Sequence, residues 1–294
     1  MRVAILGCGY IGLELARQLQ GEHDVVGMRR SDSGIEAIEA TGATAVQGDI
    51  TDPEDLAEVP DADAVVFAAS SGGRGADAAR EIYVDGLRTA IDHFCTDRDG
   101  APDRVIYTSS TGVYGDHDGD WVDEETQIDP TTEKTEVLAE AERIALERPI
   151  DDTDGSVARF AGLYGPERYR LERYVEGPVT EGYLNMVHQA DAAGAVAYLL
   201  EADVARREAV NVVDDEPVSK WEFADWLAAQ CEMPEPPKHT KAERLDDDSL
   251  SDAAKRRIQT SKRVSNEKLR ELGYDFTYPT YREGYQAAIE AYLA

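Results

Sequence analysis

RVAILGCGYIG, residues 2–12 of this 294-residue chain, joins an apolar run to three glycines in G-x-G-x-x-G spacing: Gly7, Gly9 and Gly12. The apolar run predicts a strand, and the residues from Tyr10 and Ile11 onward predict an amphipathic helix. Between them, Gly7 permits a tight turn, Gly9 a close backbone approach to a pyrophosphate, and Gly12 close packing of helix on strand. The free N–H groups at such a helix start favour an anion, so all five residues are expected to bind a dinucleotide. The alternative is a glycine turn without a ligand.

The segment after the second predicted strand indicates which dinucleotide. An NAD site usually ends this strand with an acid that hydrogen-bonds the ribose 2′-hydroxyl. Here residues 24–28 are followed by Arg29, Arg30 and Ser31. Two guanidinium groups and a hydroxyl suit a 2′-phosphate, so the sequence favours NADP, with NAD as the alternative. The opposing interpretation is that both arginines are simply solvated in a loop.

Two later strand ends supply further candidates for cofactor binding. Asp49 and Ile50 follow the third predicted strand, where Asp49 could accept a hydrogen bond from an adenine amino group and Ile50 could pack on the ring. A helix-cap or turn role before Pro53 is the alternative for Asp49. Ala68 and Ser70 end the fourth predicted strand and begin a glycine-rich loop, which is expected beside the cofactor.

Short apolar runs alternate with helical patterns through the first two thirds of the chain. Parallel strands buried on both faces give such runs, so the sequence predicts an α/β fold with a doubly wound parallel sheet of the Rossmann type. Strands are expected at 2–6, 24–28, 43–47, 64–68, 104–108, 156–160 and 209–213. Helices are expected at 11–20, 34–41, 76–94, 135–147, 191–201, 220–230 and 281–292.

The domain organisation follows from where this alternation stops. We expect an NAD(P)-binding Rossmann domain over residues 1–165, completed by about 190–213. Residues 166–189 and 214–294 are expected to form a smaller substrate-binding lobe over the carboxyl ends of the strands.

Several motifs occur in an order that resembles the extended short-chain dehydrogenase/reductase superfamily. They are the glycine loop, Asp49, YTSSTGVYG (107–115), RFAGLYGP (159–166), NMVH (185–188) and NVVDDEP (211–217). The resemblance covers nearly the whole chain, and its G-x-G-x-x-G spacing resembles the atypical subset of that superfamily. It implies an NAD(P)-dependent epimerase, dehydratase or reductase acting on a sugar nucleotide or a similar small molecule, and a homodimer formed through a helix pair.

The resemblance also implies catalytic residues. By position, Ser110 would hydrogen-bond the substrate. A tyrosine about two dozen residues later would be the acid/base, with a lysine four residues after it to lower its pKa. In DPTTEKTEVLAE (129–140) these two positions hold Thr132 and Glu136, and Tyr-x-x-x-Lys occurs nowhere in the chain. Lys134 lies two residues away from the expected lysine position.

Three functional interpretations therefore stay open. The chain could be a reductase or epimerase with a displaced acid/base, for which the candidates are Tyr114, Tyr164, Tyr169 and His188. It could catalyse weakly with Ser110, Glu136 and bound water. Alternatively, it could bind the nicotinamide cofactor as a sensor without turnover.

The remaining pocket candidates carry less specific signals. By resemblance, Tyr114, Tyr164, Asn185 and His188 would line the substrate pocket. For each tyrosine, packing in a pocket wall is the alternative to catalysis, and for His188 it is capping or packing. No ordered ligand spacing predicts a metal.

Composition limits the partners that the chain can have. The formal net charge is −30, from 60 acidic and 30 basic side chains, which opposes binding to nucleic acid and to anionic membranes. We interpret the acidity as adaptation to high salt, where self-repulsion is screened. Three scattered cysteines and the lack of a long apolar run or signal-peptide pattern favour a cytoplasmic protein.

Overall fold

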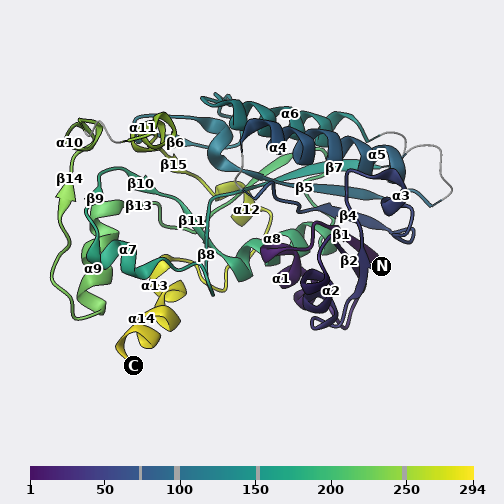
Figure 1. Ribbon diagram of the computed structural model, residues 1–294, viewed down its shortest axis with the longest axis horizontal. Helices are drawn as coiled ribbons and strands as arrows, with labels where there is room; N and C mark the ends of the chain where they lie inside the picture. The colour runs from purple at the N-terminus through teal and green to yellow at the C-terminus, as the bar shows by residue number, and fades with distance from the viewer. Residues whose placement is uncertain (73–74, 96–99, 150–152, 247–249) are drawn as a thin grey trace.

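The computed structural model describes residues 1–294 except 73–74, 96–99, 150–152 and 247–249. A seven-stranded parallel sheet forms its centre, in the order β12-β7-β5-β4-β1-β2-β3 (Figure 1). The strands are β1 (Arg2–Leu6), β2 (Asp24–Arg29), β3 (Thr44–Gln47), β4 (Ala64–Phe67), β5 (Arg104–Ser110), β7 (Asp154–Phe160) and β12 (Ala209–Val212). Each of the seven predicted strands is one of these, so the predicted α/β Rossmann fold is confirmed.

Helices cover both faces of this sheet, as a doubly wound fold requires. On one face α1 (Tyr10–Leu19) packs against α8 (Gln189–Glu201). The other face carries α4 (Ala76–Arg80), α5 (Leu87–Cys95) and α6 (Glu133–Glu147) (Figure 1). The two short helices α2 (Asp32–Glu39) and α3 (Pro53–Leu56) follow β2 and β3. The apolar faces of the sheet and helices form the main core.

One predicted helix is interrupted. The sequence predicts a continuous helix over 76–94, but a π-helical turn, η1 (Glu81–Gly86), separates α4 from α5. A π turn closes its hydrogen bonds five residues apart, which widens the helix locally. Because of this widening, the side chains of η1 point in directions that differ from those in a regular α-helix.

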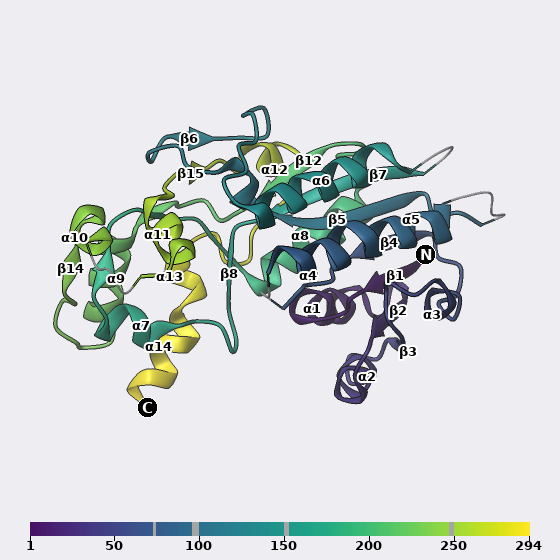
Figure 2. The same ribbon diagram turned by 45° about the horizontal axis from the view of Figure 1, so that its top comes forward.

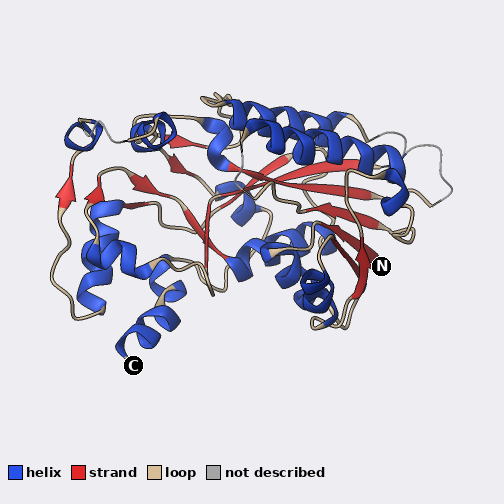
Figure 3. Cartoon of the chain, viewed as in Figure 1, coloured by secondary structure: helices blue, strands red, loops and turns tan. Residues whose placement is uncertain are grey.

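The C-terminal part forms a second lobe of short elements (Figures 2 and 3). Its helices are α7 (Leu171–Glu176), α9 (Lys220–Gln230), α10 (Lys241–Leu245), α11 (Asp252–Gln259), α13 (Tyr281–Gly284) and α14 (Gln286–Leu293). The predicted helix 281–292 is thus two helices. Aromatic side chains of this lobe, among them Phe223, Tyr281 and Tyr285, form a second apolar cluster. By contrast, α12 (Glu267–Glu271) packs on β12 and buries Leu269 in the main core.

Within the part of the chain that the structure describes, four short strand pairs lie outside the central sheet. They are β8 (Gly162–Tyr164) with β11 (Met186–His188), β6 (Trp121–Val122) with β15 (Arg263–Val264), β10 (Tyr183–Leu184) with β13 (Val218–Ser219), and β9 (Val179–Thr180) with β14 (Lys238–His239). A short 3-10 helix, η2 (Thr111–Tyr114), follows β5. No helix in the described residues is both long and apolar enough to cross a bilayer.

The strand order fixes where a ligand would bind. The chain winds from β1 to β3 on one side and then returns to place β4 on the other side of β1. In such sheets the crevice at the carboxyl ends of the strands beside this reversal is the ligand site. In Figure 2 the second lobe lies beyond these carboxyl ends.

Candidate cofactor and active site

A cavity of about 560 Å³ opens at this reversal point. Its volume lies within the usual range of ligand pockets, roughly 300–1,000 Å³. The segments that follow β1, β2, β3 and β4 line it, together with residues of β2, β5, η1, α6, β7 and β8. Of the residues predicted to bind the cofactor, the wall includes Gly7, Gly9, Tyr10, Ile11, Arg29, Arg30, Ser31, Asp49, Ile50, Ala68 and Ser70.

The glycine loop has the shape that a pyrophosphate needs. Gly7 has φ +78°, and a Cβ there would lie 2.3 Å from the Ala69 Cα, so no side chain fits. A Cβ on Gly9 would touch only the Gly7 carbonyl at 3.7 Å, because the protein leaves this space open. The first turn of α1 carries no capping side chain and no acid, which leaves its N–H groups for an anion. These residues therefore fit a dinucleotide phosphate.

Gly12 lies outside the cavity wall and acts from behind it. A Cβ there would lie 3.0 Å from an Ile5 side-chain carbon of β1, which is closer than side chains normally pack. Its role is therefore the packing of α1 on the strand, as expected for the third glycine of the motif. Gly12 therefore does not contact a ligand in the cavity directly.

The end of β2 places positive charge on the cavity rim. Arg29 lies across the start of α2, since a Cβ on Gly34 would come within 2.8 Å of its Nε. Arg30 is mostly exposed, and its guanidinium lies 3.3 Å from an Asp49 carboxylate oxygen. Ser31 caps α2 by accepting a hydrogen bond from the Gly34 N–H. The hydroxyl proton of Ser31 is not used by that cap, so it is available to a phosphate.

Asp49 is a turn residue that also lines the cavity. It lines the cavity, and it also accepts hydrogen bonds from the Thr51 N–H and hydroxyl at 3.0 and 2.8 Å. Burial raises the pKa of Asp49, but the Thr51 hydrogen bonds and the Arg30 charge outweigh burial and hold the pKa below its usual value. Asp49 is therefore a charged turn residue at the cavity edge.

The end of β5 brings Ser110 to the cavity wall. Its oxygen accepts a hydrogen bond from the Gly112 N–H at 3.1 Å, which caps η2. A hydroxyl that accepts in this way still has its own proton to donate. Ser110 therefore has the position and the free donor that its predicted substrate contact requires.

Thr132 and Glu136, predicted as catalytic by position, do not line the cavity. Thr132 is the N-cap of α6, and its oxygen accepts from the Thr135 N–H at 3.1 Å in a capping box. Glu136 is exposed to solvent. Because α6 begins at Glu133, its second residue, Lys134, is the one that reaches the wall. The expected catalytic positions of Thr132 and Glu136 are therefore not at the cavity wall, where Lys134 lies instead.

The predicted substrate-pocket residues also lie outside the wall. Tyr114 is buried and donates to the Asn211 Oδ1 at 2.9 Å. Tyr164 is buried and stacks on Tyr285. Asn185 bridges backbone groups of Lys262 and Val264, the first at 2.9 Å and the second at 2.7 Å. Their side chains hold the fold in this structure, and none faces the cavity.

His188 is buried and accepts a hydrogen bond from the Ala190 N–H at 3.2 Å, which caps α8. Burial lowers its pKa to about 4. At neutral pH the ring is uncharged, so His188 does not act as an imidazolium general acid. Tyr169, another displaced candidate, is also absent from the wall, and burial raises its pKa.

Two tyrosines do line the cavity, Tyr10 and Tyr83. The Tyr10 hydroxyl donates to the Pro166 carbonyl at 3.0 Å, and burial raises its pKa to about 12. Tyr83 lies on η1, and its pKa is lowered. Tyr83 is not among the sequence candidates for the acid/base, which come from the segments at residues 107–115, 129–140, 159–169 and 185–188. Lys134, which lines the same wall, lies two residues from the expected lysine position.

Known proteins share this fold and sequence pattern. Residues 7–203 match the NAD(P)H-binding family. Protein YeeZ of Escherichia coli K12 is 30% identical over 286 residues, covering 95% of this chain and 96% of that protein. The structure of a proposed NAD-dependent epimerase/dehydratase from Methylobacillus flagellatus is similar, with a TM-score of 0.76 and 28% identity over 99% of this chain and 98% of that one. dTDP-glucose 4,6-dehydratase from Bacillus anthracis, solved in complex with NAD, shares the fold, with a TM-score of 0.78 and 17% identity over 99% and 96%.

Proposed function

The chain belongs to the NAD(P)H-binding family, and from that premise we propose that it is an NAD(P)-dependent oxidoreductase or epimerase. Its substrate would be a sugar nucleotide or a similar small molecule with a hydroxyl or carbonyl carbon to oxidise or reduce. The similarity to the Methylobacillus protein supports this class of reaction.

The positive charge of the cavity wall is the main support for this proposal. Acids outnumber bases 60 to 30 in the chain, yet among the residues that the structure describes the wall holds four bases and one acid. The bases are Arg29, Arg30, Lys134 and Arg168, and the acid is Asp49. Such an inversion of charge concentrates anionic ligands in a cleft. A phosphorylated cofactor together with a phosphorylated substrate has the chemistry that this wall favours.

Different residues of the wall would bind the cofactor and orient the substrate. The glycine loop and the start of α1 would hold the pyrophosphate, and Ser110 would orient the substrate oxygen. When bound, the cofactor supplies or accepts a hydride at the nicotinamide ring. The chain itself must then give or take the proton on the substrate oxygen.

Within this function we propose a preference for NADP, supported by Arg29, Arg30 and Ser31 on the wall. The Arg29→Ala, Arg30→Ala double variant should weaken NADPH binding by at least about 100-fold, since it removes two charged hydrogen bonds that each contribute about 1.5–3 kcal/mol. NADH affinity should change by less than about threefold. Fluorescence titration with each cofactor measures both constants.

Arg148→Ala is the matched control, because Arg148 pairs with the exposed Asp92 far from the cavity wall. An equal loss of NADPH and NADH in the double variant would contradict the NADP assignment. Failure of the wild type to bind either cofactor would contradict the function.

The departure from Tyr-x-x-x-Lys favours a second candidate function, a nicotinamide sensor without turnover. A panel of sugar nucleotides, followed by absorbance of the reduced cofactor, separates the two functions. Binding without turnover across the panel would favour the sensor. Turnover of any panel member would favour the enzyme.

A further inference from the structure

Tyr83 lies in the wall of the cavity, and its hydroxyl group has a proton that its two hydrogen bonds with Ser71 do not use. The side chain is buried except at the wall, with 8% of its surface exposed. Its oxygen accepts hydrogen bonds from the Ser71 N–H at 3.2 Å and from the Ser71 hydroxyl at 3.3 Å. Both bonds use the oxygen as acceptor, so they leave the Tyr83 proton for another group.

The π turn explains why a tyrosine of this helix faces the cavity. η1 inserts a wider turn between α4 and α5, and it packs against α6. π turns often occur at functional sites because they displace a side chain from the regular helical position. Here the displaced segment brings Tyr83 to the same wall as Ser110 and Lys134.

The surroundings of Tyr83 favour its ionised form. Burial raises the pKa of Tyr83, but the Ser71 hydrogen bonds and the positive charge of Lys134 outweigh burial and lower it below its usual value. Tyr107, which interacts electrostatically with Tyr83, is fully buried in β5 and stays neutral, because burial raises its pKa. Lys134, in the N-terminal turn of α6, is the charged side chain that lowers the pKa of Tyr83.

We propose that Tyr83 is the acid/base of this site and that Lys134 is its positioning residue, in place of the absent Tyr-x-x-x-Lys pair. The proposal deepens the proposed function and rests on it. In the oxidation direction, the ionised Tyr83 oxygen takes the hydroxyl proton of the substrate, and the hydride that leaves the same carbon would pass to the oxidised nicotinamide cofactor. Reduction runs in reverse: the hydride goes to the carbonyl carbon and the Tyr83 proton to its oxygen. Ser110 donates a hydrogen bond to that oxygen in both directions.

The first test reads Tyr83 directly, without substrate or cofactor. The chain holds 14 tyrosines, so the protein is labelled with 13C at the tyrosine ζ carbon and the Tyr83 signal is identified by its loss in Tyr83→Phe. We expect Tyr83 to titrate below the usual tyrosine range. Lys134→Met should move the titration to higher pH, and Lys134→Arg should restore it. A Tyr83 titration that is unchanged in Lys134→Met would overturn the pairing.

The second test measures turnover and cofactor binding together. Tyr83→Phe should keep NADPH affinity but lose at least about 100-fold in kcat, the usual contribution of a general acid or base. Lys134→Met should shift the pH profile of oxidation to higher pH, and Lys134→Arg should shift it back. Tyr198→Phe, which loses only a hydrogen bond to the Leu272 carbonyl in another part of the fold, is the matched control.

The outcomes separate the two levels of the proposal. A wild type that binds NADPH but turns over no substrate contradicts the proposed function itself. A wild type that turns over, with Tyr83→Phe equally active, contradicts only the role of Tyr83. If Tyr83→Phe lost NADPH binding as well as activity, the residue would be structural, and this too would overturn the assignment.

Discussion

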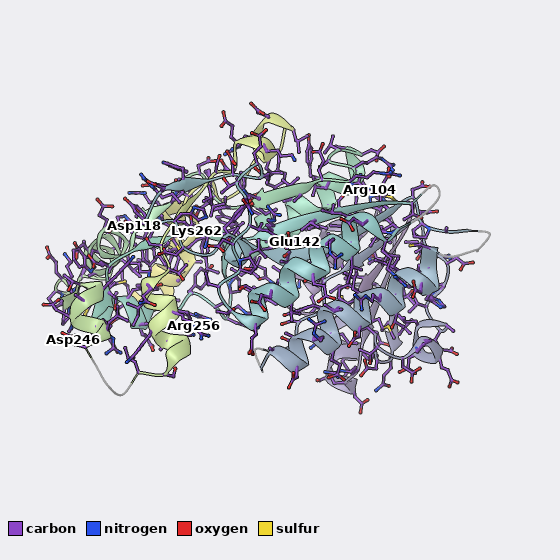
Figure 4. All side chains as sticks on the ribbon, turned by 90° about the horizontal axis from the view of Figure 1, so that it is seen from above. Arg104, Asp118, Glu142, Asp246, Arg256 and Lys262 are labelled. Carbon is purple, nitrogen blue, oxygen red and sulfur yellow. The ribbon has the colours of Figure 1, made fainter. Side chains whose placement is uncertain are left out.

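At the scale of single residues, Glu142 holds the carboxyl end of β5 in place. Glu142, on α6 and labelled in Figure 4, is 3% exposed, and its carboxylate accepts from Arg159 of β7 at 2.8 Å. The same carboxylate pairs with the Ser109 hydroxyl at 2.6 Å, next to Ser110. Arg159 in turn donates to the Tyr114 oxygen at 2.8 Å. One buried network therefore joins α6, β5 and β7 beside the cavity.

Removal of Glu142 should be costly, because the Arg159 guanidinium would remain buried without its partner. We expect Glu142→Ala to lower the free energy of unfolding by about 3–5 kcal/mol in urea titrations. The control is Asp92→Ala, which breaks an ion pair with Arg148 whose side chains are 52% and 42% exposed. That variant should change the free energy by less than about 1 kcal/mol. Similar losses in both variants would show that burial does not set the strength of the pair.

At the scale of elements, the start of α6 decides which residues reach the cavity. The Thr132 capping box begins the helix so that Lys134 faces the wall and Glu136 faces solvent. We expect Thr132→Ala to cost about 1 kcal/mol of stability by thermal or urea unfolding, and Thr132→Ser to keep most of it. If Thr132 were instead a proton donor, Thr132→Ala would lose at least about 100-fold in kcat with stability unchanged.

The same scale shows what sequence alone could predict. The seven sheet strands are apolar runs buried on both faces, and such runs are visible without tertiary contacts. The glycine loop is equally local, because Gly7, Gly9 and Gly12 act within one turn. Tyr83 could not be assigned in this way. The apolar spacing over 76–94 is that of an ordinary helix, and the π turn that moves Tyr83 depends on packing against α6.

A second reason concerns residues whose function depends on distant segments. Tyr164 and His188 lie in motifs that resemble pocket elements, yet each is buried against aromatic rings of the C-terminal part, Tyr285 for the first and Tyr278 for the second. These contacts join positions about ninety or more residues apart in the sequence. Periodicity and spacing hold no information on such contacts, so pocket and core tyrosines look alike in the sequence.

At the scale of the whole molecule, the net charge of −30 opposes compaction. Ion pairs relieve part of this repulsion locally, as where Arg206 and Arg207 both meet Asp154. With twice as many acids as bases, at least half of the carboxylates have no basic side chain of their own to pair with. Figure 4 labels two exposed acids, Asp118 beside the second lobe and Asp246 within it. The repulsion is therefore a property of the entire surface, and only the solvent can screen it.

We expect the melting temperature to rise with KCl because salt shortens the range of this repulsion, from about 10 Å at 0.1 M to about 3 Å at 1 M. The rise between these concentrations should be at least about 4 °C, corresponding to ~2 kcal/mol for a chain of this size. Calorimetry at pH 7 measures it. Screening depends on ionic charge, so sucrose at equal osmolality serves as the uncharged control and should give a smaller rise. A melting temperature that is flat in KCl, or that rises equally in sucrose, would contradict adaptation of the surface to high salt.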